Sequence, residues 1–329
     1  DNLSWAIVFP IFAPYFLDPN NALFSPEVSS GTRSMVLGFF LMAFSFGQFI
    51  GAPLIGEYGD KHGRKKALGM SVFFTMIGLS LSAWSMGKND LVLLFVGRLV
   101  TGIFSSSTSL CLTCISDLSE SQRAKVKDFG YLSMIAGIAF VLGAFAGGKL
   151  ADPTLNRSFD VTLPIWLASA LSLLNFLFIL FGFKETVQFH PQGNFYFFES
   201  FRNIKIALKS EMLKGVYTLF FLFLFAWTIL FQFFPVLTVE RYHFSSSNIG
   251  DLALYMGFCW AFSSGYLNRL LSHRYPAKKI LEVCLVSFTI LSALIVVPTD
   301  LVSVLFILGL SIMLGGLAWP ICNGLISNT

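Results

Sequence analysis

Ten long apolar runs are the feature that most restricts the fold of this chain. Each holds about twenty residues, the length of an α-helix that crosses the hydrocarbon core of a bilayer. With 55% of its 329 residues hydrophobic and only 12% charged, the chain is too apolar for a soluble core of this size. The sequence therefore predicts an all-α membrane protein with spans at residues 2–17, 34–59, 67–87, 90–116, 129–151, 161–183, 214–239, 249–271, 278–298 and 301–327.

Positive charges are distributed unevenly between the loops. Sixteen lysine and arginine residues lie in the loops after the second, fourth, sixth and eighth spans, whereas four lie in the opposite loops. Because loops rich in lysine and arginine stay on the cytoplasmic side of a membrane, these loops and the amino terminus are predicted to be cytoplasmic. The small formal charge of +4 fits membrane orientation and indicates no nucleic-acid partner.

The longest predicted cytoplasmic connection divides the chain into residues 1–186, a six-span bundle, and residues 214–329, a four-span bundle. Within the connection, residues 187–213, an aromatic cluster at 195–198 precedes Arg202, Lys205 and Lys209. This pattern is typical of an amphipathic helix lying on the inner leaflet. The alternative is an ordinary tether that happens to carry aromatic residues.

The second bundle weakly repeats the first, since residues 227–235 echo residues 5–14. Repeats of this kind are typical of transporters built from duplicated bundles. On that symmetry we expect two six-helix bundles, of which ten helices are present here. Helix 1 is expected to be shortened, and helices 11 and 12 are expected to be missing from this sequence.

A polar, glycine-rich stretch at residues 51–66 is predicted to form a tight turn between two spans. Gly56 and Gly63 permit a close backbone approach or a positive φ that a Cβ would resist. Asp60 and Arg64, four residues apart at a helix end, can form an ion pair. For the neighbouring lysines the alternative is that they only satisfy the positive-inside bias.

Several motifs together resemble the major facilitator superfamily, and within it the drug:proton antiporters of the tetracycline and multidrug efflux type. The loop signature of that family is matched by Gly56, Asp60, Gly63, Arg64 and Lys65. Further matches are Arg98 and Gly102 in the fourth span, Asp117 at its end, Gly143, Gly147 and Gly148 in the fifth, and Glu185 and Thr186 after the sixth. The resemblance implies the major facilitator fold. It also implies that Asp117 joins Gly56, Asp60, Gly63 and Arg64 in a cytoplasmic latch between the bundles.

A charged residue within an apolar span, Arg98, indicates a function beyond packing. Arg98 is a cation deep in a span, where a charge is costly and functional by default. We expect Asp1 to load and release the coupling proton, with Arg98 biasing its pKa. Alternatively, Asp1 lies near the membrane surface and Arg98 pairs with a backbone carbonyl.

Gly143 and Gly147 have the four-residue spacing that lets helices approach closely, so packing alone also explains these two glycines. Ala144 stands where the antiporter pattern has a proline.

A central substrate cavity is expected to be lined by residues that combine an aromatic face or apolar stem with a hydrogen-bonding group. Each of these residues is individually more often structural than substrate-contacting. The set consists of Trp5, Gln48, Trp227, Gln232, Tyr255, Trp319 and Asn323. Such a cavity suits an amphipathic or aromatic solute.

The sequence thus predicts a secondary active transporter that exports an amphipathic small molecule by alternating access, driven by protons. A proton-coupled importer of a nutrient or siderophore, and a non-transporting receptor or scaffold, are the alternatives. No nucleotide-binding loop, nucleophile elbow or HExxH motif is present, so an enzyme is not predicted. We expect no cofactor and no metal site, with the proton gradient as energy source. The expected partners are solute, protons and lipid, and the chain is expected to act as a monomer in a bacterial inner membrane.

Overall fold

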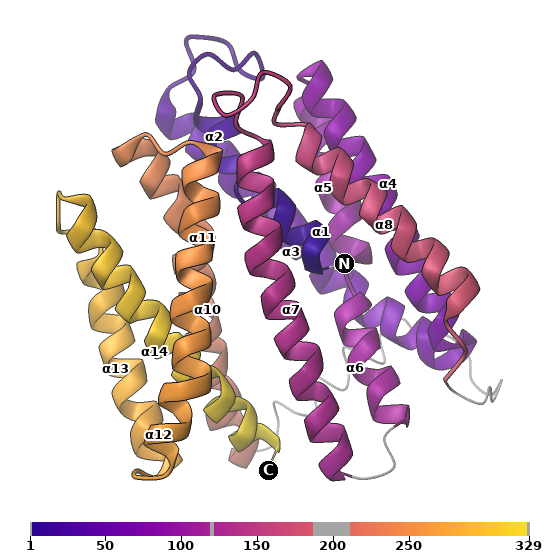
Figure 1. The fold of residues 1–329 in the computed structure, drawn as a ribbon, viewed down its shortest axis with the longest axis vertical. Coiled ribbons are helices and arrows are strands. Elements are labelled where there is room, and N and C mark those ends of the chain that lie inside the picture. Colours follow the sequence, from indigo (N-terminus) through magenta and orange to yellow (C-terminus); the bar gives the residue numbers. More distant parts are fainter. Residues whose placement is uncertain (1, 119–121, 187–210, 328–329) are drawn as a thin grey trace. The chain divides into compact units, whose positions relative to one another are not determined.

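In this computed structural model the described residues are 2–118, 122–186 and 211–327, and they form helices without strands (Figure 1). The predicted all-α class is therefore confirmed. The helices of the first part are α1 (Asn2–Val8), α2 (Phe12–Leu17), α3 (Ser30–His62), α4 (Arg64–Lys88), α5 (Leu91–Phe104), α6 (Ser107–Leu118), α7 (Gln122–Leu150) and α8 (Leu163–Gly182). Those of the second part are α10 (Glu211–Tyr242), α11 (Ser246–Ala261), the π-helical turn η1 (Phe262–Leu267), α12 (Asn268–Ser272), α13 (Ala277–Leu294) and α14 (Leu301–Ser327).

Each of the ten predicted spans coincides with one helix or with consecutive helices. Six stretches in the described residues are long and apolar enough to cross a membrane: Ser30–His62, Arg64–Lys88, Leu91–Leu118, Leu163–Gly182, Thr218–Tyr242 and Leu301–Trp319. Large apolar side chains such as Phe181 and Val302 are 82% and 78% exposed. A helix that is apolar on all sides in this way belongs in lipid.

Three spans are interrupted, each for a local reason. Proline cannot donate a helical hydrogen bond, and Pro10 lies between α1 and α2. The fourth span breaks between α5 and α6, where the carbonyl of Phe104 accepts hydrogen bonds from the hydroxyls of Ser71 and Thr75 on α4. Within a membrane a freed carbonyl needs such a partner. The eighth span contains η1, where the Ser263 hydroxyl donates to the carbonyl of Met313.

The chain separates into two compact units. Unit 1 comprises residues 1–201 and 244–250, and unit 2 comprises residues 202–243 and 251–329. In unit 1, α4 packs against α5 and α8, α3 against α5, and α1 against α7. In unit 2, α13 packs against α14, which also contacts α10 and η1. The boundaries at 186 and 214 stay a prediction, because residues 187–210 and the predicted amphipathic helix within them lie outside the described part.

Candidate functional site

Gly63 is the single residue that separates α3 from α4. Its φ of 97° lies in the region that glycine adopts easily and other residues rarely do, and its N–H donates to Gly59 O over 3.1 Å. The prediction of a longer turn at residues 51–66 is wrong, because α3 continues to His62 and α4 begins at Arg64. One glycine suffices to redirect the chain.

Glu185, which follows α8, caps the beginning of α4. Its carboxylate accepts hydrogen bonds from the backbone N–H of Arg64 at 2.8 Å and of Lys65 at 3.1 Å. The first N–H groups of a helix have no partner within it, and the positive end of the helix dipole favours an anion there. A Cβ on Gly63 would overlap this carboxylate, so the glycine and the acid depend on each other.

Arg64 links the ends of two further segments. Its Nη1 lies 2.5 Å from Asp60 Oδ1, and its Nε lies 3.1 Å from Asp117 Oδ2 at the end of α6. The arginine side chain is only 10% exposed, whereas Asp117 is 30% and Asp60 63% exposed. Since water weakens exposed ion pairs, the pair with Asp117 contributes more. We call Asp60, Gly63, Arg64, Asp117 and Glu185 the loop cluster.

The roles of Gly56 and Glu185 differ from those expected from the sequence. Gly56 is helical, and no described atom lies within 4 Å of the place where its Cβ would stand. The expectation of a close approach at Gly56 is therefore wrong, and the close approach occurs at Gly51, whose Cβ would overlap the backbone of Ile103 on α5. Glu185 was matched as part of a family motif but not predicted as a member of the cluster. An acid shortly after the sixth predicted span was the available signal.

Neutralising Glu185 is expected to destabilise unit 1. Glu185→Ala removes the acceptor of two helix-terminal N–H groups, and we expect a loss of about 1–2 kcal/mol, as for an N-cap residue. Glu185→Gln, which keeps one acceptor oxygen but not the charge, should cost less. Thermal unfolding in detergent measures both, with Glu27→Gln in an exposed loop as control. An unchanged melting temperature for Glu185→Ala would contradict the capping role.

The glycines of α7 make close contacts within unit 1. A Cβ on Gly147 would overlap the carbonyl of Ile7 on α1, and one on Gly148 would overlap the carbonyl of Ser246. Beyond them the ammonium of Lys149 donates to the Ser247 hydroxyl over 2.8 Å. These contacts explain why α7 needs small residues, as the packing alternative states.

Asp152, just after α7, lies outside the membrane-spanning segments and belongs to the same contact region. Burial raises the pKa of its carboxyl, but hydrogen bonds from Thr154 and Ser245 and the charge of Lys149 lower it, and the net pKa lies below the ordinary value. The carboxylate therefore favours its charged form, as the nearby ammonium requires.

Arg98 projects from α5 into a group of phenylalanine rings. Its guanidinium carbon lies 4.4 Å from the ring centre of Phe44, 5.1 Å from that of Phe12 and 5.6 Å from that of Phe40. The residue is 7% exposed, and Nε makes no hydrogen bond to any described residue. The alternative pairing with a backbone carbonyl is not observed in the described residues. Asp1, the predicted partner, lies outside them.

Two of the predicted cavity residues belong to an indole cluster in unit 2. Trp260 stands between them, with its ring centre 4.9 Å from that of Trp227 and 6.2 Å from that of Trp319. A Cβ on Gly315 of α14 would overlap the Trp227 ring, so the glycine lets this indole lie against the helix. Trp260 was not predicted, because nothing in the sequence distinguishes it from an ordinary core residue.

The other predicted cavity residues are not gathered at the indole cluster by any observed contact. Tyr255 donates a hydrogen bond to the carbonyl of Leu305 over 3.1 Å, while Gln48 is exposed on α3 and Gln232 is half-buried on α10. The side chains of Trp5 and Asn323 lie outside the described part. Their role in a cavity stays a prediction.

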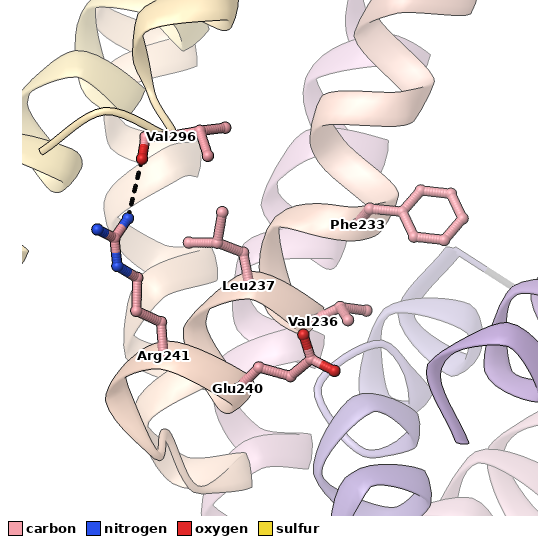
Figure 2. A pocket seen from close by; sticks show the side chains of 6 residues that line it. All are labelled: Phe233, Val236, Leu237, Glu240, Arg241 and Val296. Atoms are coloured by element: carbon pink, nitrogen blue, oxygen red, sulfur yellow. Dashed lines mark hydrogen bonds between the residues drawn. The ribbon is translucent and has the colours of Figure 1, made fainter. Parts of the chain in front are cut away.

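A pocket of about 600 Å³ in unit 2 is formed by other residues (Figure 2). It lies at the end of α10 and beside the connection between α13 and α14, where Arg241 donates to the carbonyl of Val296 over 3.1 Å. Its lining consists of Phe233, Val236, Leu237, Glu240, Arg241 and Val296. None of these residues was predicted to line the substrate cavity.

Proteins of known function show sequence similarity to this chain. A curated relative, the class H tetracycline resistance protein of Pasteurella multocida, is 30% identical over 165 residues, which are 50% of this chain and 38% of the relative. Multidrug resistance protein 2 of Bacillus subtilis (strain 168) is 23% identical over 281 residues, which are 82% of this chain and 66% of the relative. The chain thus spans less than two thirds of the length of either relative.

Solved structures share the fold. The human organic anion transporter MFSD10 (TETRAN) superposes with a TM-score of 0.69 at 20% identity, covering 99% of this chain and 82% of its own. The family model described as the Major Facilitator Superfamily matches residues 2–329. The predicted resemblance and fold are confirmed, and the relatives are transport and resistance proteins rather than enzymes. The chain belongs to the major facilitator superfamily and is a multi-pass membrane protein.

Proposed function

We propose that the chain is a secondary active transporter that exports an amphipathic or aromatic small molecule by alternating access, driven by protons. The loop cluster is the observation that carries this proposal. It joins the ends of α3 and α6, the beginning of α4 and Glu185 in the segment after α8 through side-chain ion pairs and capping hydrogen bonds. Such bonds can be exchanged without unfolding a helix. A device of this kind can hold one of two conformations until a ligand supplies the difference in free energy.

The direction of transport is supported by the relatives, whose names describe resistance to tetracycline or to several drugs. Resistance of this kind is consistent with export. The indole cluster of unit 2 supports an aromatic solute, because flat rings stack favourably on tryptophan. We place the protein in a bacterial inner membrane with the loop cluster and the amino terminus on the cytoplasmic side, as the distribution of positive charges favours.

Proton coupling is proposed to depend on Asp1, with Arg98 adjusting its protonation. A carboxyl that is buried near a fixed cation experiences opposing influences on its pKa, because burial favours the neutral form and the cation favours the charged form. This balance allows the carboxyl to titrate as its surroundings change between the two sides of the membrane.

Reconstitution into liposomes with an imposed pH gradient tests the proposal. Addition of aromatic solutes is expected to cause proton movement, reported by an entrapped pH-sensitive dye, and solute movement in the opposite direction. Asp1→Asn should abolish the coupling. Asp90→Asn is the matched control, because Asp90 caps α5 through a hydrogen bond from Leu93 N and asparagine caps equally well.

The outcomes separate the parts of the proposal. Solute flux without proton movement would contradict coupling, and coupled flux that survives Asp1→Asn would remove Asp1 from the mechanism. Movement of solute and protons in the same direction would indicate the importer instead. No flux of any solute would contradict transport itself.

A further inference from the structure

Arg98 differs from Arg33, which is also a buried arginine of unit 1. Arg33 is 3% exposed, and its guanidinium donates to the carbonyls of Asp18 at 2.6 Å, Val28 at 3.3 Å and Pro19 at 3.4 Å. These bonds hold the loop before α3, and they provide acceptors for the guanidinium N–H groups. Arg33 therefore shows what a structural arginine looks like in this unit.

Arg98 is equally buried but has no acceptor of this kind. No carboxylate among the described residues lies within ion-pair distance of its guanidinium, and its Nε is without a partner there. A buried cation without an anion costs several kcal/mol. A fold gains nothing structurally from such a group, so we expect its anion to come from outside the described residues, either from Asp1 or from a bound solute.

The rings around Arg98 stabilise the charge only in part. Phe12, Phe40 and Phe44 face the guanidinium at 4.4–5.6 Å, and each such contact contributes about 0.5–2 kcal/mol. Phenyl rings accept no conventional hydrogen bond, and the buried Nε of Arg98 has no partner among the described residues. The result is a fixed cation beside three rings, of which Phe12 and Phe40 are buried and Phe44 is partly exposed.

We propose that Arg98 binds the carboxylate of an amphipathic aromatic solute, whose apolar body lies against Phe44. This inference rests on the proposed transport function and narrows its substrate class to organic monoanions. A guanidinium matches a carboxylate with two parallel hydrogen bonds, and the partly exposed Phe44 ring contacts the apolar body of the same molecule. A neutral analogue would gain only the ring contacts, and a cationic one would be repelled.

The same guanidinium could receive its carboxylate from Asp1, so the experiment must distinguish a solute from the protein's own acid. The probes are 2-naphthoate and 2-naphthamide, which have nearly the same shape and differ in charge. Equilibrium binding to the purified protein in nanodiscs is measured for the wild type, Arg98→Gln, Arg98→Lys and Asp1→Asn. Arg157→Gln, in an exposed loop, is the matched control.

The wild type is expected to bind 2-naphthoate at least about tenfold more tightly than 2-naphthamide, the gain typical of a charge-assisted hydrogen bond. Arg98→Gln should bring that ratio close to one without weakening 2-naphthamide, and Arg98→Lys should give an intermediate ratio. Arg157→Gln should keep the preference, and Asp1→Asn should keep or increase it, because this variant removes the protein's own carboxylate that competes for Arg98. If Arg98→Gln does not fold, Phe44→Leu provides a second test, because it should weaken both probes together.

A wild type without the preference, or an Arg98→Gln variant that retains it, would overturn the inference. Loss of the preference in Asp1→Asn, or binding of neither probe by protein that carries another aromatic solute, would overturn it as well. Equal transport of both probes would leave the proposed transport function standing. Binding of 2-naphthoate without transport of any solute would leave the anion site standing and contradict the transport function.

Discussion

Gly51→Ala is expected to lower the melting temperature of the protein by roughly 2–5 °C. Gly51 lies on α3 directly against the backbone of Ile103 on α5, and an added Cβ would overlap it. The neighbouring Gly47 and Gly102 make contacts of the same kind, with the backbones of Leu99 and Phe44. Because both partners are backbone, neither can yield without separating the helices, and overpacking of this kind costs about 1–3 kcal/mol or more.

Gly56→Ala is the matched control on the same helix. No described atom lies within 4 Å of the added methyl group, and alanine is the better helix former. We expect the melting temperature in detergent, followed by tryptophan fluorescence, to stay the same or rise slightly. Equal losses for the two variants would contradict the close contact between α3 and α5.

The same contact assembles the site around Arg98. Phe40 and Phe44 are on α3, whereas Arg98 is on α5, so the rings reach the guanidinium only if the two helices lie close together. Gly102 allows this approach, since its Cβ would overlap the Phe44 backbone. A substitution that separates the helices should therefore weaken anion binding before it unfolds the protein.

The sequence predicted the helices well, because long apolar runs leave few alternatives in a membrane. It predicted the pairing of Asp60 with Arg64 from their four-residue spacing. Contacts between distant segments had no such signal. Glu185 lies about 120 positions from the N–H groups it caps, and with 38 phenylalanines in the chain no pattern marks the three that surround Arg98.

The sequence also did not indicate which glycine of α3 makes the close helix contact. Gly56 and Gly51 are both in the polar stretch that precedes Gly63, and their spacing gives no reason to rank them. Which glycine is needed depends on how α3 is rotated against α5, a property of the packed pair rather than of either helix. The family motif drew attention to Gly56, whereas the packing depends on Gly51.

Replacing Arg64 by glutamine is expected to lower solute transport at least about tenfold. The variant loses both ion pairs and leaves the partly buried Asp117 without its cation, a loss of the order of 1–3 kcal/mol. A lysine keeps the charge but cannot reach Asp60 and Asp117 from two separate nitrogens as Nη1 and Nε do, so Arg64→Lys should be intermediate. Flux in proteoliposomes is the measurement.

The loss of transport on neutralising each carboxylate of the loop cluster should be larger for the less exposed carboxylate. Asp117→Asn is expected to reduce transport more than Asp60→Asn, because Asp60 is 63% exposed and its pair is weakened by water. Lys66→Gln, at an exposed position beside the cluster, should leave transport unchanged, as its only expected role is in orientation. If Lys66→Gln were as harmful as Arg64→Gln, positive charge alone would explain the loop. The specific ion pairs of Arg64 would then have no part in the conformational change.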